Sequence, residues 1–243
     1  MNTSSDWSNY PPLGLPQFIG FETDGCATYG TIDGIESQEL FLTGKQNQYS
    51  RRWIFKMSGT TQQGNYLENV YAAIAKYGLV LESSYSQAGI TSWDEYDAEI
   101  PEPLLSQLLA EGQEWLKKWD VSFTTENIPQ EQIIQALQNA PLQTEVIDGT
   151  FRHIIEQLNL TTCWDSEYHH SGTPIQEFET PLSTFNSIVC YNQIIIKEKK
   201  MPQIKSVNIK GEEGIFLAAA TPEEFQTLCN VFGKDPNNVD ITI

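Results

Sequence analysis

The stretch FETDGCATYGTIDGIES, from Phe21 to Ser37, decides how the first half of this 243-residue chain is read. An Asp-Gly turn precedes Cys26, and apolar residues such as Ile32 and Ile35 then recur at three- and four-residue spacing. This spacing predicts a helix from about Cys26 to Leu40. A cysteine at a helix start meets the positive end of the helix dipole, which stabilises a thiolate. Cys26 is therefore a candidate nucleophile, although free cysteine is also a common small packing residue.

Two glycines, Gly30 and Gly34, fall inside the expected helix. Glycine lowers the intrinsic stability of a helix by about 1 kcal/mol relative to alanine. Small residues on one helix face also allow close packing against another backbone, and we expect these glycines to serve that purpose.

Composition and charge exclude several classes of protein. The chain is 40% hydrophobic and 19% charged, as soluble globular proteins are. Its 14 Lys and Arg against 32 Asp and Glu give a net charge of -18, which repels phosphate backbones, so no nucleic-acid partner is expected. No apolar run approaches the roughly 20 residues that span a membrane, and the N-terminus shows no secretion signal.

The four cysteines are Cys26, Cys163, Cys190 and Cys229. No pair has CxxC spacing, so a zinc ribbon is not expected. Without a secretion signal a disulfide framework is not expected either. The sequence thus predicts neither a metal nor an organic cofactor.

The chain reads as a helical part followed by a strand-rich part. Residues 1–20 are rich in proline, glycine and aromatic side chains and predict an extended arm. Helices are expected in YLENVYAAIAKYGLV with Gly78 at its end, in PEPLLSQLLAEGQEWLKKWD, and in PQEQIIQALQNAP. After Pro141, the segments LQTEVID, NSIVCYN, QIIIKEK and GIFLAAA predict strands, and TPEEFQTLCNVFG predicts a helix. The order predicts an α+β protein with a helical lobe over 21–125 and a β-rich lobe with a C-terminal helix over 126–243.

Several segments together resemble the papain-like cysteine peptidases. GCATYGTIDGIE is similar to the pattern around that family's nucleophilic cysteine, and SGTTQQGN resembles the loop after its second helix. IAKYGLVLESSY and IIQALQNAPLQTEV resemble later segments in the same order, while WDEYDAEIP and DWSNYPPLGLPQ are similar to papain-like proteins of tailed bacteriophages. The resemblance covers roughly residues 6 to 146. It implies a papain-like two-lobe fold, with a protein or peptide bound in the cleft between the lobes.

In that family a cysteine attacks the peptide carbonyl, a histidine moves the proton, an Asn or Asp orients the histidine, and an upstream Gln helps to bind the oxyanion. By resemblance, Cys26 takes the nucleophile position. Gln17 takes the oxyanion position, although its nine-residue gap to Cys26 exceeds the usual one. The segment resembling the family's histidine strand, TFNSIVCYN, holds no histidine.

The base is therefore sought among the three histidines, His153, His169 and His170. The spacing of roughly 130–150 residues after the cysteine selects His170 or its neighbour His169, and we take His170 as the candidate. His153 lies in FRHIIEQLNL, whose spacing of apolar residues predicts a helix, although the downstream WDSEY resembles the family's Asp-Ser-Tyr. All three histidines could instead be ordinary surface residues. The carboxylates Asp24, Glu36, Asp94 and Glu95 are expected to be solvated or to cap helices.

Three hypotheses about function follow. The first is peptide-bond hydrolysis through Cys26, with activity weakened or lost if no histidine acts as base. The second is a non-catalytic phage virion or accessory protein whose papain-like scaffold binds other proteins. The third is a transglutaminase- or amidase-like acyl transfer, which needs the same histidine. Under these hypotheses the protein is expected in the host cytoplasm or the phage particle.

Overall fold

The computed structural model describes residues 2–124, 126–148, 151–167 and 174–199, together with three short strands nearer the C-terminus. The chain divides into two compact units, Met1–Glu198 and Lys199–Ile243. In the second unit, β8 (Ser206–Ile209) pairs antiparallel with both β9 (Ile215–Phe216) and β10 (Val239–Thr242). The helix expected in TPEEFQTLCNVFG lies outside the described residues. Within the described ranges, no helix has the length and apolar character needed to cross a membrane.

The first half of the first unit is helical, as the sequence predicts. Its helices are α1 (Cys26–Thr43), α2 (Arg51–Ser58), α3 (Leu67–Tyr77), α4 (Trp93–Tyr96) and α5 (Leu104–Lys118). Helix α1 begins at the cysteine, and α3 ends at the expected Gly78, whose N–H donates to the carbonyl of Ile74 at 2.9 Å. Helix α2 was not predicted. It is held at its start by Ser50, whose hydroxyl accepts from the N–H of Trp53.

The second half of the first unit is built on a five-stranded antiparallel sheet. A short 3₁₀ turn (Gln130–Gln132) and α6 (Ile133–Leu137) lead into it. Its strands are β2 (Leu142–Asp148), β3 (Phe151–Gln157), β4 (Thr162–Trp164), β5 (Ile175–Glu177) and β6 (Ile188–Asn192), in the order β5-β4-β3-β2-β6. A second 3₁₀ turn (Leu182–Thr184) precedes β6, and a separate ribbon joins β1 (Trp119–Phe123) to β7 (Ile194–Glu198). LQTEVID, NSIVCYN and QIIIKEK are therefore strands, as predicted.

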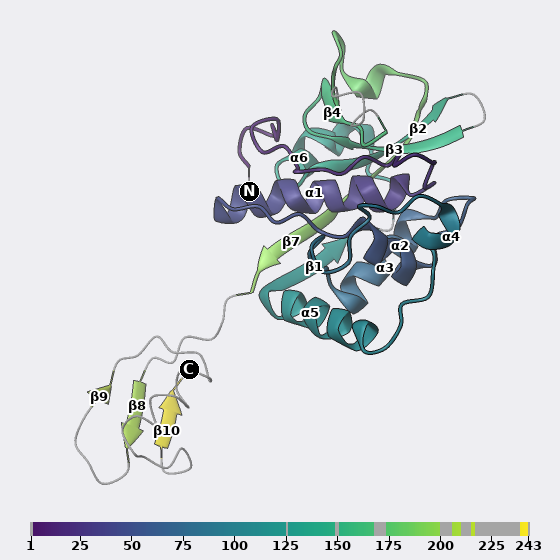
Figure 1. Cartoon of the computed structure of the whole chain (residues 1–243). Helices are drawn as coiled ribbons and strands as arrows, with labels where there is room; N and C mark the ends of the chain where they lie inside the picture. The colour runs from purple at the N-terminus through teal and green to yellow at the C-terminus, as the bar shows by residue number, and fades with distance from the viewer. Residues whose placement is uncertain are drawn as a thin grey trace. The chain divides into compact units, whose positions relative to one another are not determined.

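Helix α1 lies between the five-stranded sheet and the other helices (Figure 1). Its residues from Ala27 to Glu39 are all buried. On one side, Ile32 and Ile35 join the core of the helical lobe around Trp53 and Tyr71. On the other side, α1 packs against β3. A helix covered on both sides places its first residue at the junction of the two lobes.

The two glycines of α1 allow its close approach to the sheet. A Cβ atom on Gly30 would lie 3.1 Å from the Ile154 side chain in β3, tighter than most such contacts. A Cβ atom on Gly34 would lie 2.6 Å from the Gln143 amide in β2, too close to fit without movement. The glycines therefore lie where the helix approaches the sheet closely, and a larger side chain would require Ile154 or the Gln143 amide to move.

The N-terminal arm crosses to the sheet lobe, as its course above α1 indicates (Figure 1). Trp7 is 1% exposed and its indole N–H donates to the carbonyl of Leu137 at 2.6 Å. The Trp7 backbone N–H also donates to the carbonyl of Leu158, at 2.9 Å. The arm is therefore fixed to the first unit by its tryptophan.

A cluster of charged side chains is buried beneath α1. The Arg51 guanidinium bridges Asp33 and Glu36, and all three side chains are fully buried. The expectation that Glu36 is solvated or caps a helix is therefore wrong. Burial raises the pKa of Asp33 to about 7; the charge of Arg51 opposes this rise and that of Glu36 adds to it. Arg51 is fully buried although Ser50 and Arg52 flank it in the sequence, so no local pattern marks it as a core residue.

Glu156, in β3, faces this cluster and accepts a hydrogen bond from the Ser37 hydroxyl at 2.8 Å. Burial, and then the charge of Asp33, raises the pKa of Glu156 well above its ordinary value. Because the folded-state pKa lies above the unfolded one, Glu156 lowers the stability of the protein as pH rises above about 4.3, the unfolded value.

We therefore expect Glu156→Gln to be tolerated at pH 5 and to gain stability over wild type as pH rises. Between the unfolded and folded pKa values the gain approaches about 1.4 kcal/mol per pH unit. Urea unfolding at pH 5, 7 and 9 measures this difference, with the exposed Glu99→Gln as the matched control. A difference between variant and wild type that does not change with pH would contradict a neutral buried carboxyl.

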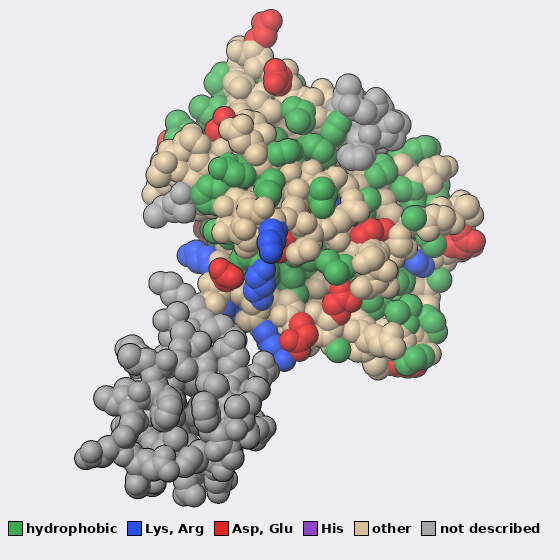
Figure 2. Space-filling view, turned by 60° about the vertical axis from the view of Figure 1, so that its left-hand side comes forward, with side chains coloured by type: hydrophobic (Ala, Val, Ile, Leu, Met, Phe, Trp, Pro, Cys, Tyr) green, Lys and Arg blue, Asp and Glu red, His purple; other side chains and the backbone are tan. Residues whose placement is uncertain are grey.

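The acidic side chains of the surface are dispersed. Figure 2 shows Asp and Glu scattered over the visible face in ones and twos, between hydrophobic and neutral polar groups. The acidic side chains visible on this face therefore form no single acidic patch.

Candidate active site

Cys26 is the first residue of α1. Gly25 precedes it as the N-cap, no side chain caps the helix, and its first turn holds no acidic residue. The positive end of the helix dipole is therefore not neutralised by a neighbouring carboxylate. The thiol is partly exposed, which leaves it accessible to a reactant.

The packing of α1 on β3 brings a histidine to this thiol. Residues nearer the start of α1 contact residues nearer the start of β3. Gly34 lies near Glu156, Gly30 lies against Ile154, and Cys26 lies beside His153. The Cys26 thiol lies close enough to His153 to help raise the pKa of its ring, and the His153 side chain is 16% exposed. The nucleophile candidate and a histidine thus meet at the start of the helix.

The hairpin of β3 and β4 brings a carboxylate to the other side of the ring. Glu156 in β3 pairs with Trp164, the last residue of β4. Asp165 directly follows β4, and its N–H donates to the carbonyl of Pro174 at 2.8 Å. The Nε2 atom of His153 lies 2.8 Å from Oδ1 of Asp165.

With Nε2 engaged by Asp165, Nδ1 is the ring nitrogen left for the thiol. Burial disfavours the charged imidazolium, but the hydrogen bonds to Asp165 and Cys26 outweigh this and raise the pKa of His153 to about 10. The ring is therefore charged at neutral pH. A protonated imidazole beside a sulfur at a helix start is the arrangement that favours the reactive thiolate.

The other described cysteines have a different environment. Cys163 is buried, and burial raises the pKa of its thiol to about 12. Burial also raises the pKa of Cys190, although the Asn192 amide opposes the rise. Both are therefore poor nucleophiles at neutral pH.

Gln17 lies beside the turn that carries Asp165. Its backbone N–H donates to the carbonyl of Ser166 at 3.1 Å, and the residue is 5% exposed. Its side-chain Nε2 donates to Oε1 of Glu22 at 2.6 Å. The nine-residue gap before Cys26 is therefore taken up by a loop that returns Gln17 to the side of the site where Asp165 lies.

Two of the three histidines considered as the base cannot be placed, whereas the two segments considered for it are described. His169 and the selected candidate His170 lie outside the described residues. TFNSIVCYN includes β6, which pairs with β2 at the edge of the sheet. FRHIIEQLNL, predicted as a helix, contains strand β3 instead. The pattern misleads because Ile154 packs against the helical lobe while Ile155 packs against Cys163, so adjacent positions are both apolar.

One group of described side chains has the donor set of a metal site. Ligand atoms of His153, Asp165 and Glu167 lie within 4.8 Å of one another. The Oε2 atom of Glu167 is 3.8 Å from Nε2 of His153, the nitrogen already hydrogen-bonded to Asp165. A metal ion bound to Nε2 of His153 would break the hydrogen bond between this nitrogen and Asp165. Asp165 therefore cannot orient the ring through that hydrogen bond while the metal is bound.

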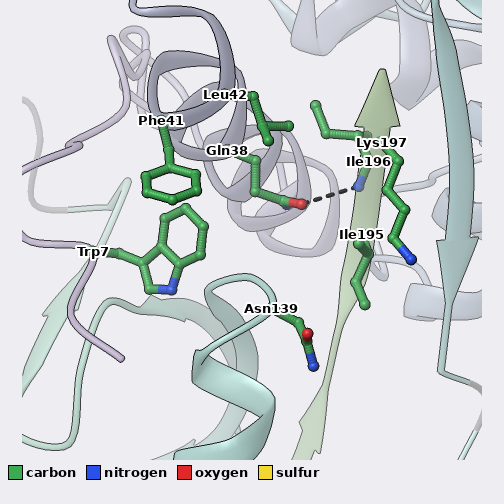
Figure 3. A pocket seen from close by; sticks show the side chains of 8 residues that line it. All are labelled: Trp7, Gln38, Phe41, Leu42, Asn139, Ile195, Ile196 and Lys197. Carbon is green, nitrogen blue, oxygen red and sulfur yellow. Dashed lines mark hydrogen bonds between the residues drawn. The ribbon is translucent and has the colours of Figure 1, made fainter. Parts of the chain in front are cut away.

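A small cavity of about 70 Å³ lies near the other end of α1 (Figure 3). Trp7 and Phe41 line it, and the Gln38 side chain accepts from the N–H of Ile196 at 3.0 Å. Gln38 is 12 residues beyond Cys26 in the same helix, which is roughly 18 Å at 1.5 Å per residue. This cavity is therefore separate from the thiol and its histidine.

No protein-family model and no curated protein matches the sequence. Solved structures do match. The ragweed cysteine protease Amb a 11 in its proform aligns with a TM-score of 0.56 and 13% identity, over 80% of this chain and 66% of that one. The cysteine protease CMS1MS2 of Carica candamarcensis, in complex with E-64, gives a TM-score of 0.51 at 13% identity, over 80% of this chain and 98% of that one.

A bacterial structure gives the same result. Xylellain, a cysteine protease from Xylella fastidiosa, aligns with a TM-score of 0.52 and 12% identity, over 80% of this chain and 85% of that one. At such low identity the likeness bears on the fold alone. Together with the helices and antiparallel sheets described above, it shows that this chain has an α+β, papain-like fold.

Proposed function

We propose that this chain hydrolyses peptide bonds through Cys26, with His153 as general acid and base and Asp165 orienting the imidazole. The observation that carries the proposal is the contact of His153 with both Cys26 and Asp165. A nucleophile, a base within hydrogen-bond reach and a third group that orients the base are the three parts that thiol catalysis requires.

The proposed steps use the chain's own groups. The Cys26 thiolate attacks the carbonyl carbon of the substrate, and the electron pair of the carbonyl bond moves to oxygen. The imidazolium of His153 then gives its proton to the amide nitrogen, the electron pair on oxygen re-forms the carbonyl, the carbon–nitrogen bond breaks, and the amine departs, leaving an acyl-enzyme. His153, now neutral, accepts a proton from water, and the water attacks the acyl group and releases Cys26.

The oxyanion formed in the attack requires hydrogen-bond donors. The first N–H groups of a helix have no acceptor within the helix, so the Cys26 backbone N–H can supply one donor. The side-chain amide of Gln17, whose backbone N–H donates to the Ser166 carbonyl, is the proposed second donor. His153 thereby replaces His170 as the proposed base, while Cys26 and Gln17 keep the roles that the family resemblance implies.

The main reason to expect a non-catalytic protein was the lack of a histidine on the segment TFNSIVCYN. A histidine on β3 beside the thiol supports the catalytic proposal instead. A bacteriophage source and a virion role stay predictions from the sequence.

The test is selective alkylation with iodoacetamide at pH 6, followed by mapping of the modified cysteines. We expect Cys26 to react at least about tenfold faster than Cys163 and Cys190, because alkylation consumes the thiolate. The raised pKa of His153 keeps the imidazolium present from pH 6 up to about 10, so this selectivity should persist through neutral pH.

Cleavage of a casein substrate by wild type, with Cys26→Ser as the control, gives the second readout. Slow, equal labelling of all cysteines at pH 6 would overturn the proposal. Rapid labelling of Cys26 without any peptide cleavage would support the pairing of the Cys26 thiol with the His153 imidazole but contradict the proposal that the chain hydrolyses peptide bonds.

A further inference from the structure

Glu22 lies in the short loop between the proposed oxyanion donor and the nucleophile. This loop closes on itself: Phe18 and Glu22 form an isolated β-bridge, and the Thr23 hydroxyl donates to the carbonyl of Gln17 at 3.1 Å. The loop turns at Asp24, whose φ of 53° is in the left-handed region. The residues that lengthen the gap between Gln17 and Cys26 therefore form a compact structure around Gln17.

The Glu22 carboxylate is itself held in place by this loop. Its Oε1 atom accepts the N–H of Asp24 at 3.1 Å and the Gln17 Nε2 at 2.6 Å. Glu22 is an exposed residue, and these two hydrogen bonds are the contacts that hold its carboxylate at Gln17.

The orientation of the Gln17 amide decides whether it can serve an oxyanion. A side-chain amide has a donating NH₂ end and an accepting oxygen end, and only the NH₂ end stabilises negative charge. Gln17 is 5% exposed, and among the described residues its Oε1 has no hydrogen-bond partner. Because Oε1 of Gln17 has no partner, the hydrogen bond between its Nε2 and Glu22 sets the orientation of the amide.

We infer that Glu22 is a positioning residue, which locks the Gln17 amide with its NH₂ end oriented for the oxyanion. An ionised carboxylate only accepts, so it binds the NH₂ end and rejects the oxygen end. One N–H of the amide bonds to Glu22, and the second remains for the substrate oxygen. The inference rests on the proposed function, because it gives Gln17 its role in the same reaction.

The experiment compares two reactions of Cys26. A peptide aldehyde is attacked by the thiolate: a carbon–sulfur bond forms, the carbonyl electron pair moves to oxygen, and the oxyanion donors stabilise the adduct. Iodoacetamide is attacked at its methylene carbon with loss of iodide and forms no oxyanion. A group that acts through the oxyanion donor affects the first reaction and spares the second.

For Glu22→Ala we expect the inhibition constant of the peptide aldehyde to rise about tenfold, since loss of a complete oxyanion donor costs about 10²–10³ in rate. The kcat for casein peptides should fall by a similar factor with KM little changed, and the iodoacetamide rate should stay at the wild-type value. Glu22→Gln keeps an oxygen that can accept from Gln17 but adds an NH₂ group that can also bind the oxygen end, so its loss should be smaller than that of Glu22→Ala, within about threefold of wild type. Asp24→Asn, which alters the other carboxylate of this loop and tolerates a left-handed backbone, is the matched control and should resemble wild type.

Three results would overturn the inference: unchanged aldehyde inhibition in Glu22→Ala, tighter inhibition, or an equal loss in both reactions. Circular dichroism melting of each variant shows whether an equal loss of both reactions reflects unfolding. If Glu22→Ala is unfolded, the two reactions are compared in Glu22→Gln instead, provided that this variant melts like wild type. Slow alkylation of Cys26 in wild type would reject the proposed function itself and the inference with it. Fast alkylation with no aldehyde inhibition in wild type would reject only the oxyanion site and the role of Glu22.

Discussion

Replacing His153 by alanine should lower kcat/KM for peptide cleavage by about 10⁴-fold or more, as loss of a catalytic base does in comparable triads. The ring is hydrogen-bonded to Asp165 and lies beside the Cys26 thiol, and its side chain is only 16% exposed. Without it, the thiol loses its cationic neighbour and the leaving amine loses its proton donor. Steady-state kinetics measure the loss, and the iodoacetamide rate of Cys26 at pH 6 should fall as well.

The matched controls are His169→Ala and His170→Ala, the two histidines that sequence spacing selects. We expect both variants to retain wild-type cleavage and labelling. If His170→Ala abolished cleavage while His153→Ala retained it, the base would be His170 and the role assigned to His153 would be wrong. Loss in all three variants, with native melting curves, would also count against a single base at His153.

Replacing Arg51 by methionine should destabilise the protein by roughly 3–5 kcal/mol, since it leaves buried carboxylates without their counter-charge. Arg51 bridges Asp33 and Glu36, and its Nη1 also donates to the carbonyl of Tyr49 at 2.8 Å. The total stability of a typical domain is about 5–15 kcal/mol, so this single change is expected to unfold a large fraction of the protein. Urea unfolding at neutral pH measures the effect.

A triple variant separates charge from packing in this cluster. Combining Arg51→Met with Asp33→Asn and Glu36→Gln removes the unpaired carboxylates and should recover much of the lost stability, because buried ion pairs are often replaceable by neutral groups. If the triple variant were as unstable as Arg51→Met alone, the loss would come from the volume and hydrogen bonds of the guanidinium. The charge explanation would then be wrong.

The helical half of the fold could be predicted because its signals are local. Cys26 follows a turn and opens a run with helical spacing, and Gly78 ends α3. The strands β2, β6 and β7 are rich in β-branched residues and short, and the sequence predicts them too. Such features depend on a few neighbouring residues, which is the information that a single sequence holds.

The site was predicted only in part because its second half depends on distant contacts. His153 lies on a strand buried from both sides, and its apolar neighbours imitate a helical pattern. Asp165 becomes significant only through the register of β3 and β4, which the sequence does not state. Arg51 was missed for the same reason, since its partners Asp33 and Glu36 lie on a different helix.

The anchoring of the arm has a consequence for how the protein is made. Trp7 bonds to the carbonyl of Leu137, 130 residues later in the chain. A ribosome adds roughly 5–20 residues per second, so about 6–26 seconds pass between the synthesis of Trp7 and that of Leu137. During that interval the apolar side chain of Trp7 lacks its binding surface and is exposed to chaperones. The helices α1 to α5 can form meanwhile, and docking of the arm belongs among the last events of folding.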